Sequence, residues 1–91
     1  MQLSSFRQLI PLSGTATVTP AAVGGGSAVG CNEILVQNQS DVITLLVGAS
    51  SAQPIQILPG QSATFRVNNT SLLYVSTASG SAAWGALAGV Y

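Results

Sequence analysis

The stretch PIQILPGQSATFRV, residues 54–67, contains two short runs in which apolar and polar side chains alternate. In the first run Ile55 and Ile57 flank a glutamine, and in the second, residues 63–67, every other side chain is apolar. A period of two is the pattern of a β-strand that buries one of its faces, and the Pro and Gly between the runs favour a turn. The stretch therefore predicts two strands that meet at a Pro-Gly corner.

The same period of two recurs along most of the chain. Alternating runs separated by turn-forming residues lie at 31–38, 41–48, 71–77 and 82–91, with a weaker candidate at 12–19. Short strands spaced at about 8–12 residues are typical of an antiparallel sandwich or barrel. We therefore expect an all-β fold: a single antiparallel β-sandwich or jelly-roll-like domain of about seven short strands, formed by residues 29–91.

The first 28 residues differ from the rest in composition. TPAAVGGGSAVG, residues 19–30, is rich in small, flexible residues, as linkers are, and FRQLIPLSG, residues 6–14, is apolar with one arginine. Residues 1–28 are therefore predicted to form an extended N-terminal arm and Gly-rich linker that reach away from the sandwich. Because chain ends fray unless something binds them, we expect a neighbouring subunit to contact this arm, through Phe6, Arg7, Leu9 and Ile10.

Charged residues make up only 4% of the chain, against about 25% in an average soluble domain. Two arginines and two acids cancel, and the chain has neither lysine nor histidine. Since neutral surfaces tend to associate, we expect copies of the chain or another protein to cover much of this surface. The alternative is a monomer kept soluble by its hydroxyl and amide groups.

The same scarcity of charge excludes two classes of partner. Duplex binding needs several contacts from Lys or Arg to phosphates, so nucleic acid is not an expected partner, and an anionic membrane surface is disfavoured for the same reason. The longest apolar run, residues 82–91, is shorter than the roughly 20 residues that span a bilayer. Residues 1–14 lack the pattern of a secretory signal, so the protein is expected to be made in a cytoplasm.

Several strand residues are predicted to point away from the core. Alternation places Leu35, Val42 and Leu46 on outer faces, where another subunit could cover them; isolated surface hydrophobes are the alternative. Trp84 is expected to pack in the core or at an interface, and we include it with the predicted interface residues.

Arg66 lies on the outward side of its predicted strand and completes the predicted interface. We expect it to pair with Glu33 or Asp41, either within the subunit or across an interface. An exposed pair of this kind contributes only about 0–1 kcal/mol, so its use would be to fix register and specificity.

Residues that could perform catalysis are scarce. Without histidine there is no His-based triad or His metal site, and Cys31 has no neighbouring histidine to lower its pKa. Glu33 and Asp41 could in principle form an acid–base pair, but the first is predicted to point outward and the second to open a turn. We therefore expect no enzymatic activity, no metal, no cofactor and no small-molecule substrate.

The strand-and-turn segments ILVQNQSD, VITLLVG, IQILPGQSATFRV and LLYVSTASGSAAW together resemble small virion proteins of tailed bacteriophages, which are β-sandwich or jelly-roll chains. The similar part covers about residues 31–87, and its most recognisable pieces are the LPGQS corner and the LYVSTASGSA hairpin. These motifs are architectural and transfer no functional residue.

The resemblance implies a component of the virion. Within that class we expect a capsid decoration, or cement, protein on the capsid surface that bridges neighbouring copies of the major capsid protein. By analogy with decoration proteins at three-fold positions, it would be a homotrimer. A head–tail, tail or fibre component is the alternative. A more distant one is a carbohydrate-binding or adhesion module that stacks sugars on Trp84, Tyr74 or Tyr91.

Overall fold

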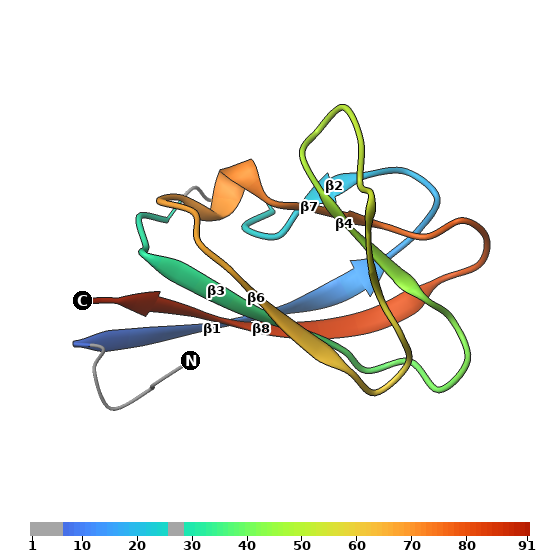
Figure 1. The fold of residues 1–91 in the computed structure, drawn as a ribbon, viewed down its shortest axis with the longest axis horizontal. Helices are drawn as coiled ribbons and strands as arrows, with labels where there is room; N and C mark the ends of the chain where they lie inside the picture. Colours follow the sequence, from blue (N-terminus) through green and yellow to red (C-terminus); the bar gives the residue numbers. More distant parts are fainter. Residues whose placement is uncertain (1–6, 26–28) are drawn as a thin grey trace.

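The chain folds into two antiparallel β-sheets that lie face to face (Figure 1). The computed structural model describes residues 7–25 and 29–91. Its strands are β1 (Gln8–Ala16), β2 (Ala21–Ala22), β3 (Glu33–Asn38), β4 (Leu45–Gly48), β5 (Ile55–Ile57), β6 (Ser62–Phe65), β7 (Tyr74–Ser76) and β8 (Ala82–Val90). The first sheet has the order β1-β8-β3-β6 and the second β2-β7-β4-β5. The predicted all-β sandwich is therefore confirmed, although the two-residue strand β2 falls where a linker was expected.

The Pro-Gly corner at residues 58–61 is a tight turn. The Gln61 amide donates to the Leu58 carbonyl at 3.0 Å, and Gly60 has a φ of 78°. Proline at the second position and a positive φ at the third define a type II turn, which strongly favours glycine at that third position. The turn joins β5 to β6, which belong to different sheets, so it carries the chain from one layer to the other.

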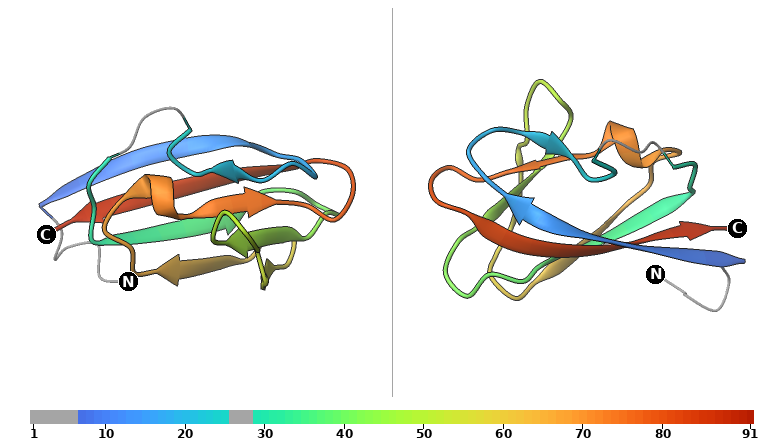
Figure 2. Two further views of the ribbon diagram at one scale, coloured as in Figure 1. Left: turned by 90° about the horizontal axis from the view of Figure 1, so that it is seen from above. Right: turned by 180° about the vertical axis from the view of Figure 1, so that it is seen from behind.

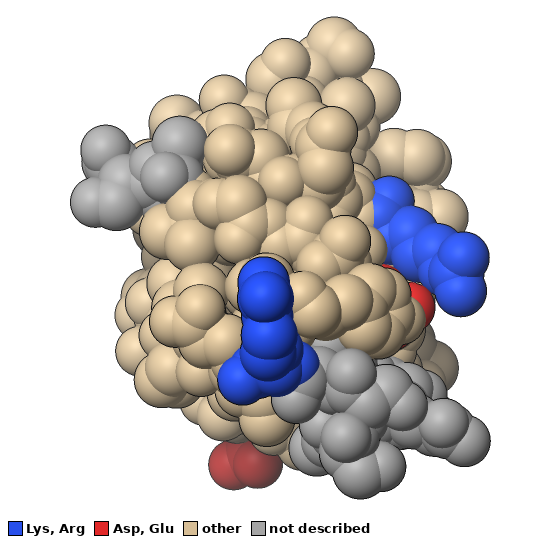
Figure 3. All heavy atoms as spheres, turned by 90° about the vertical axis from the view of Figure 1, so that its left-hand side faces the viewer, with Lys and Arg blue, Asp and Glu red and all other residues tan. Residues whose placement is uncertain are grey.

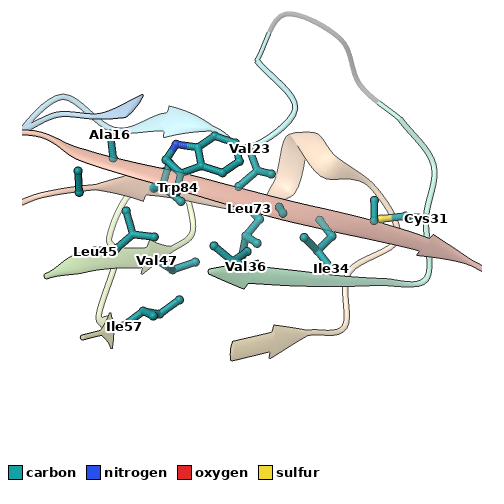
Figure 4. Packing of buried hydrophobic residues seen from close by; sticks show 14 residues of the cluster. Ala16, Val23, Cys31, Ile34, Val36, Leu45, Val47, Ile57, Leu73 and Trp84 are labelled. Carbon is teal, nitrogen blue, oxygen red and sulfur yellow. The ribbon is translucent and has the colours of Figure 1, made fainter. Parts of the chain in front are cut away.

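The core lies between the two sheets (Figure 4). Alternation supplies it as predicted: Ile34 and Val36 of β3 face Leu45 and Val47 of β4, and all four are fully buried. Strand β8 contributes a large side chain among small ones, and its buried hydrophobic residues are Ala82, Trp84, Ala86 and Ala88. Protein interiors are close-packed with few voids, so the small residues of β8 leave the space that the large Trp84 side chain occupies.

A buried amide joins the two layers beside this core. The Asn38 side chain is inaccessible to solvent, and its Nδ2 donates to the carbonyls of Ile43 and Ile57 at 2.7 and 2.9 Å. Its Oδ1 accepts the backbone N–H of Ser40 at 2.9 Å. The backbone of the same residue bonds to both sides of the corner, donating to Gln61 and accepting from Gly60. One residue of the first sheet therefore holds the two segments that enter and leave the second.

The prediction of an arm over residues 1–28 is wrong for residues 8–16. This segment is β1, which pairs with β8 along nine residues, from Gln8 opposite Val90 to Ala16 opposite Ala82. Its inward side chains Ile10 and Leu12 pack against the core, and Ala16 is buried. It is an edge strand, paired only with β8. Its side chains are more exposed than those of a central strand, and the alternation of buried and exposed residues is less regular. Figure 2 shows β1 lying along β8 in both views. The expected arm residue Phe6 lies outside the described residues.

Replacing Asn38 by alanine is expected to destabilise the fold by about 2–3 kcal/mol, because two buried carbonyls lose their donor. Chemical denaturation of the variant and of the wild type measures this difference. The control is Gln37→Ala, at the adjacent position on the exposed side of β3, where we expect a change within about 0.5 kcal/mol. Equal stability of the two variants would contradict a bridging role for the Asn38 amide.

Candidate interaction surfaces

The predicted interface residues fall on opposite sides of the sandwich. Leu35 lies on the outer face of the first sheet, because Ile34 and Val36 beside it point into the core. Val42 and Leu46 line a shallow hollow on the outer side of the second sheet, together with Gln56. The structure thus collects them into two separate surfaces, whereas the sequence could not say which of them would lie together.

Two of the predicted interface residues are core residues instead. The Trp84 side chain is 5% exposed and belongs to the buried cluster. It lies against β1 at Gly14, where a Cβ would come within 2.9 Å of the indole Cζ2, so only glycine leaves room for the ring. Ile10 also packs against the core. Leu9, its neighbour, is exposed, as alternation requires of a strand with one buried face.

A groove runs over the outer face of the first sheet. Its volume is about 270 Å³, and its lining includes no charged residue: Leu35, Leu87, Gln37, Gln39, Ser13 and Gly85 supply most of it. A Cβ at Gly85 would approach Gln39 Nε2 to 2.7 Å, so the glycine allows this amide to lie across β8. The groove thus combines aliphatic walls with two amide groups, a surface suited to an uncharged polypeptide segment.

Sequence reasoning missed most of this groove. Alternation in 82–91, with Trp84 and Ala86 inward, could have placed Leu87 outside beside Leu35. The part of the groove that β1 forms, at Ser13, could not have been found, because residues 1–28 were assigned to an arm.

Val42 projects from a turn whose shape is fixed by hydrogen bonds. Its exposed fraction is 81%. The Ser40 hydroxyl oxygen accepts the backbone N–H of Val42 at 3.3 Å and that of Ile43 at 3.0 Å, while the Ser40 N–H donates to Asn38. The turn is therefore hydrogen-bonded to the buried amide, and the valine projects into solvent from a backbone with a defined hydrogen-bonding pattern.

Arg66 pairs with Glu33, which is one of the two carboxylates that were predicted as its partner. Arg66 Nε lies 3.4 Å from Glu33 Oε1, and its side chain is 86% exposed. Glu33 lies on the outer side of β3, as predicted, but other residues cover it there, and it is only 8% exposed. The Tyr91 hydroxyl donates to Glu33 Oε1 at 3.0 Å, and the Tyr91 N–H donates to Asn32 Oδ1, so the end of β8 is fastened over the carboxylate.

The positive charges gather at one end of the molecule. Figure 3 looks onto the end of the sandwich where β8 finishes, and both arginine side chains are visible there, with an acidic group beside one of them. Arg7 is exposed at this end, where its backbone N–H donates to the Val90 carbonyl. Asp41, by contrast, lies beyond the other end of β3.

The geometry does not bring the two carboxylates together. Glu33 opens β3 and Asp41 lies three residues beyond its last residue, Asn38, so at about 3.3 Å per residue they are separated by roughly the length of the strand, about 17 Å. They cannot form the acid–base pair considered above. The Cys31 thiol donates to the Val67 carbonyl, and burial raises its pKa, which opposes the thiolate that a nucleophile requires. Within 7–25 and 29–91, no three acidic, cysteine or histidine residues cluster as metal ligands would.

Comparison with protein families, with characterised proteins and with solved structures finds no match to this chain. In the described part of the chain no helix is long and apolar enough to cross a membrane.

The hydrogen bond to Glu33, together with burial and the nearby negative charge, raises the pKa of Tyr91. A group whose pKa is raised on folding stabilises the fold below its unfolded pKa, and this contribution is lost as the pH rises through the folded value. We expect Glu33→Gln to lower the pKa of Tyr91, measured from tyrosinate absorbance in a Tyr74→Phe background. Asp41→Asn serves as the charge-matched control and should leave this titration unchanged; an unmoved titration in Glu33→Gln would contradict the assignment.

Proposed function

We propose that this chain is a jelly-roll structural protein of a virion, and that it acts as a capsid decoration protein. The observation that carries the proposal is the set of strand pairs. Strands pair first with last throughout: β1 with β8, β2 with β7, β3 with β6 and β4 with β5. This is the order obtained when a long antiparallel ribbon folds over itself, with β8–β3 and β7–β4 as the contacts formed by the wrapping. Such eight-stranded double sheets recur in viral capsid and lectin domains.

The two outer surfaces support a bridging role. The groove with Leu35 and the hollow with Val42 and Leu46 lie on opposite sides of one small sandwich. A protein with a binding surface on each side can hold two neighbours at once, which is what a molecule that spans the joints of a capsid must do. In this proposal, the partners are the major capsid protein and further copies of the chain, assembled as a homotrimer.

The composition suits binding of this kind. Apolar surface removed from water contributes roughly 25 cal/mol per Å², while each charged group buried without a partner opposes association. With four charged residues in the chain and Glu33 already covered within the subunit, little desolvation of charge opposes contact. Decoration would strengthen a capsid by adding such buried area across its joints.

The carbohydrate-binding alternative loses its main residue. Trp84 was the largest aromatic group available for stacking on a sugar, and its burial under β1 removes it from the surface. Tyr91 remains half exposed, but its hydroxyl is bound to Glu33. A tail, neck or fibre position within the virion is the closer alternative.

Copy number in purified virions tests the proposal. A decoration protein is expected in a fixed ratio to the major capsid protein, whereas a neck or tail component forms a single small ring. Quantitative mass spectrometry of particles from the virus that encodes this chain measures the ratio, with the major capsid protein as internal standard. Absence from the particle would contradict a virion role, and a ring-sized copy number would move the chain to the neck or tail.

A further inference from the structure

We propose that copies of this chain bind one another head to tail, with the turn at residues 40–43 of one copy seated on the first sheet of the next. Val42 enters the groove beside Leu35 and Leu87, and Asp41 faces Arg66. The inference rests on the self-association included in the proposed function and specifies the contact that produces it.

The first support is the order of the backbone that carries the inserting side chain. Val42 is 81% exposed, so ordering the backbone beneath it adds no packing of its side chain within the subunit. Here the turn is held by the two hydrogen bonds to the Ser40 hydroxyl and by the Ser40–Asn38 bond. A binding residue that is already fixed loses little conformational entropy on association, which favours affinity.

The second support is the match between this turn and the groove. A space of about 270 Å³ with aliphatic walls accommodates a branched apolar side chain together with part of its backbone. Gln37 and Gln39 line the same space, and a side-chain amide can both donate to and accept from peptide groups. The groove therefore offers partners for the main chain of a turn as well as for its side chain.

The third support is charge complementarity. Glu33 lies two residues before Leu35 on the same side of β3, about 6.6 Å away, and Arg66 Nε is 3.4 Å from its carboxylate. A turn that sets Val42 on Leu35 thus brings the adjacent Asp41 within reach of the Arg66 guanidinium, which is largely exposed. The exposed acid of one copy would meet the exposed cation of another, and this would fix the orientation of the contact.

The edges of the sheets favour contact through faces. Pro11 lies within the edge strand β1, and Pro54 directly precedes the edge strand β5. A proline at a sheet edge removes a backbone N–H that an added strand would use as a hydrogen-bond donor. Because the turn and the groove are different parts of the molecule, a bound pair still has one free turn on one copy and one free groove on the other. A contact of this type closes into a ring when its rotation permits, a trimer among the possibilities.

Complementation between two variants tests the contact. Val42→Ser removes the inserting side chain and Leu35→Ser disables the groove, so each variant alone should weaken self-association at least tenfold, the effect of losing a central apolar contact. Mixed in equal amounts, they should form a dimer and nothing larger, since one intact turn can bind one intact groove. Sedimentation velocity at a concentration above the wild-type midpoint of assembly measures the species, and circular dichroism verifies that each variant is folded.

The matched control is Val18→Ser, which alters a valine that is 60% exposed and outside both surfaces; it should assemble as the wild type does. Full assembly of Val42→Ser, or a mixture that stays monomeric, would overturn the proposal, as would a wild type that is monomeric at every concentration. None of these outcomes changes the copy number in virions, so failure of this contact is distinguishable from failure of the decoration function.

Discussion

The buried side chain of Asn38 is the constraint on which the rest of the structure depends. The chain must leave the first sheet after β3, enter the second at β4, and return through the corner between β5 and β6. Each crossing exposes backbone carbonyls at a place where neither sheet can satisfy them, and a buried carbonyl without a donor is expensive. One amide supplies donors to both crossings. Its oxygen then orders Ser40, so the same residue that closes the core also determines the position of the exposed turn.

Much of the sandwich could be predicted from alternation. The inward sets of β3 and β4 were identified correctly because both strands are central to their sheets and bury one complete face. The corner at residues 58–61 was recognisable because Pro followed by Gly suits few backbone conformations. These features depend on residues close together in sequence, and local patterns report them.

The features that were missed depend on residues far apart in sequence. Residues 8–16 were assigned to an arm because their pairing partner, β8, lies at the other end of the sequence. The outward direction of Glu33 follows from alternation, but nothing near it in sequence shows that Tyr91 would cover it. Alternation places Asn38 at the end of the run 31–38 without a role, because that role depends on carbonyls five and nineteen residues away. In each case the environment of the residue is set by segments far away in sequence, and a single sequence does not show which segments these are.

The pairing of first strand with last also governs when the protein can fold. The sequence separation between paired strands is largest for β1–β8 and β2–β7. Chains dominated by such distant pairs fold slowly, because the conformational entropy of the intervening chain is lost before the stabilising contacts form. During synthesis, the inner surface of β1 and the layer beneath it stay uncovered until β8 has left the ribosome. Folding is therefore expected to be slow and to wait for the synthesis of β8, and the nascent chain would be open to aggregation or to chaperones throughout that interval.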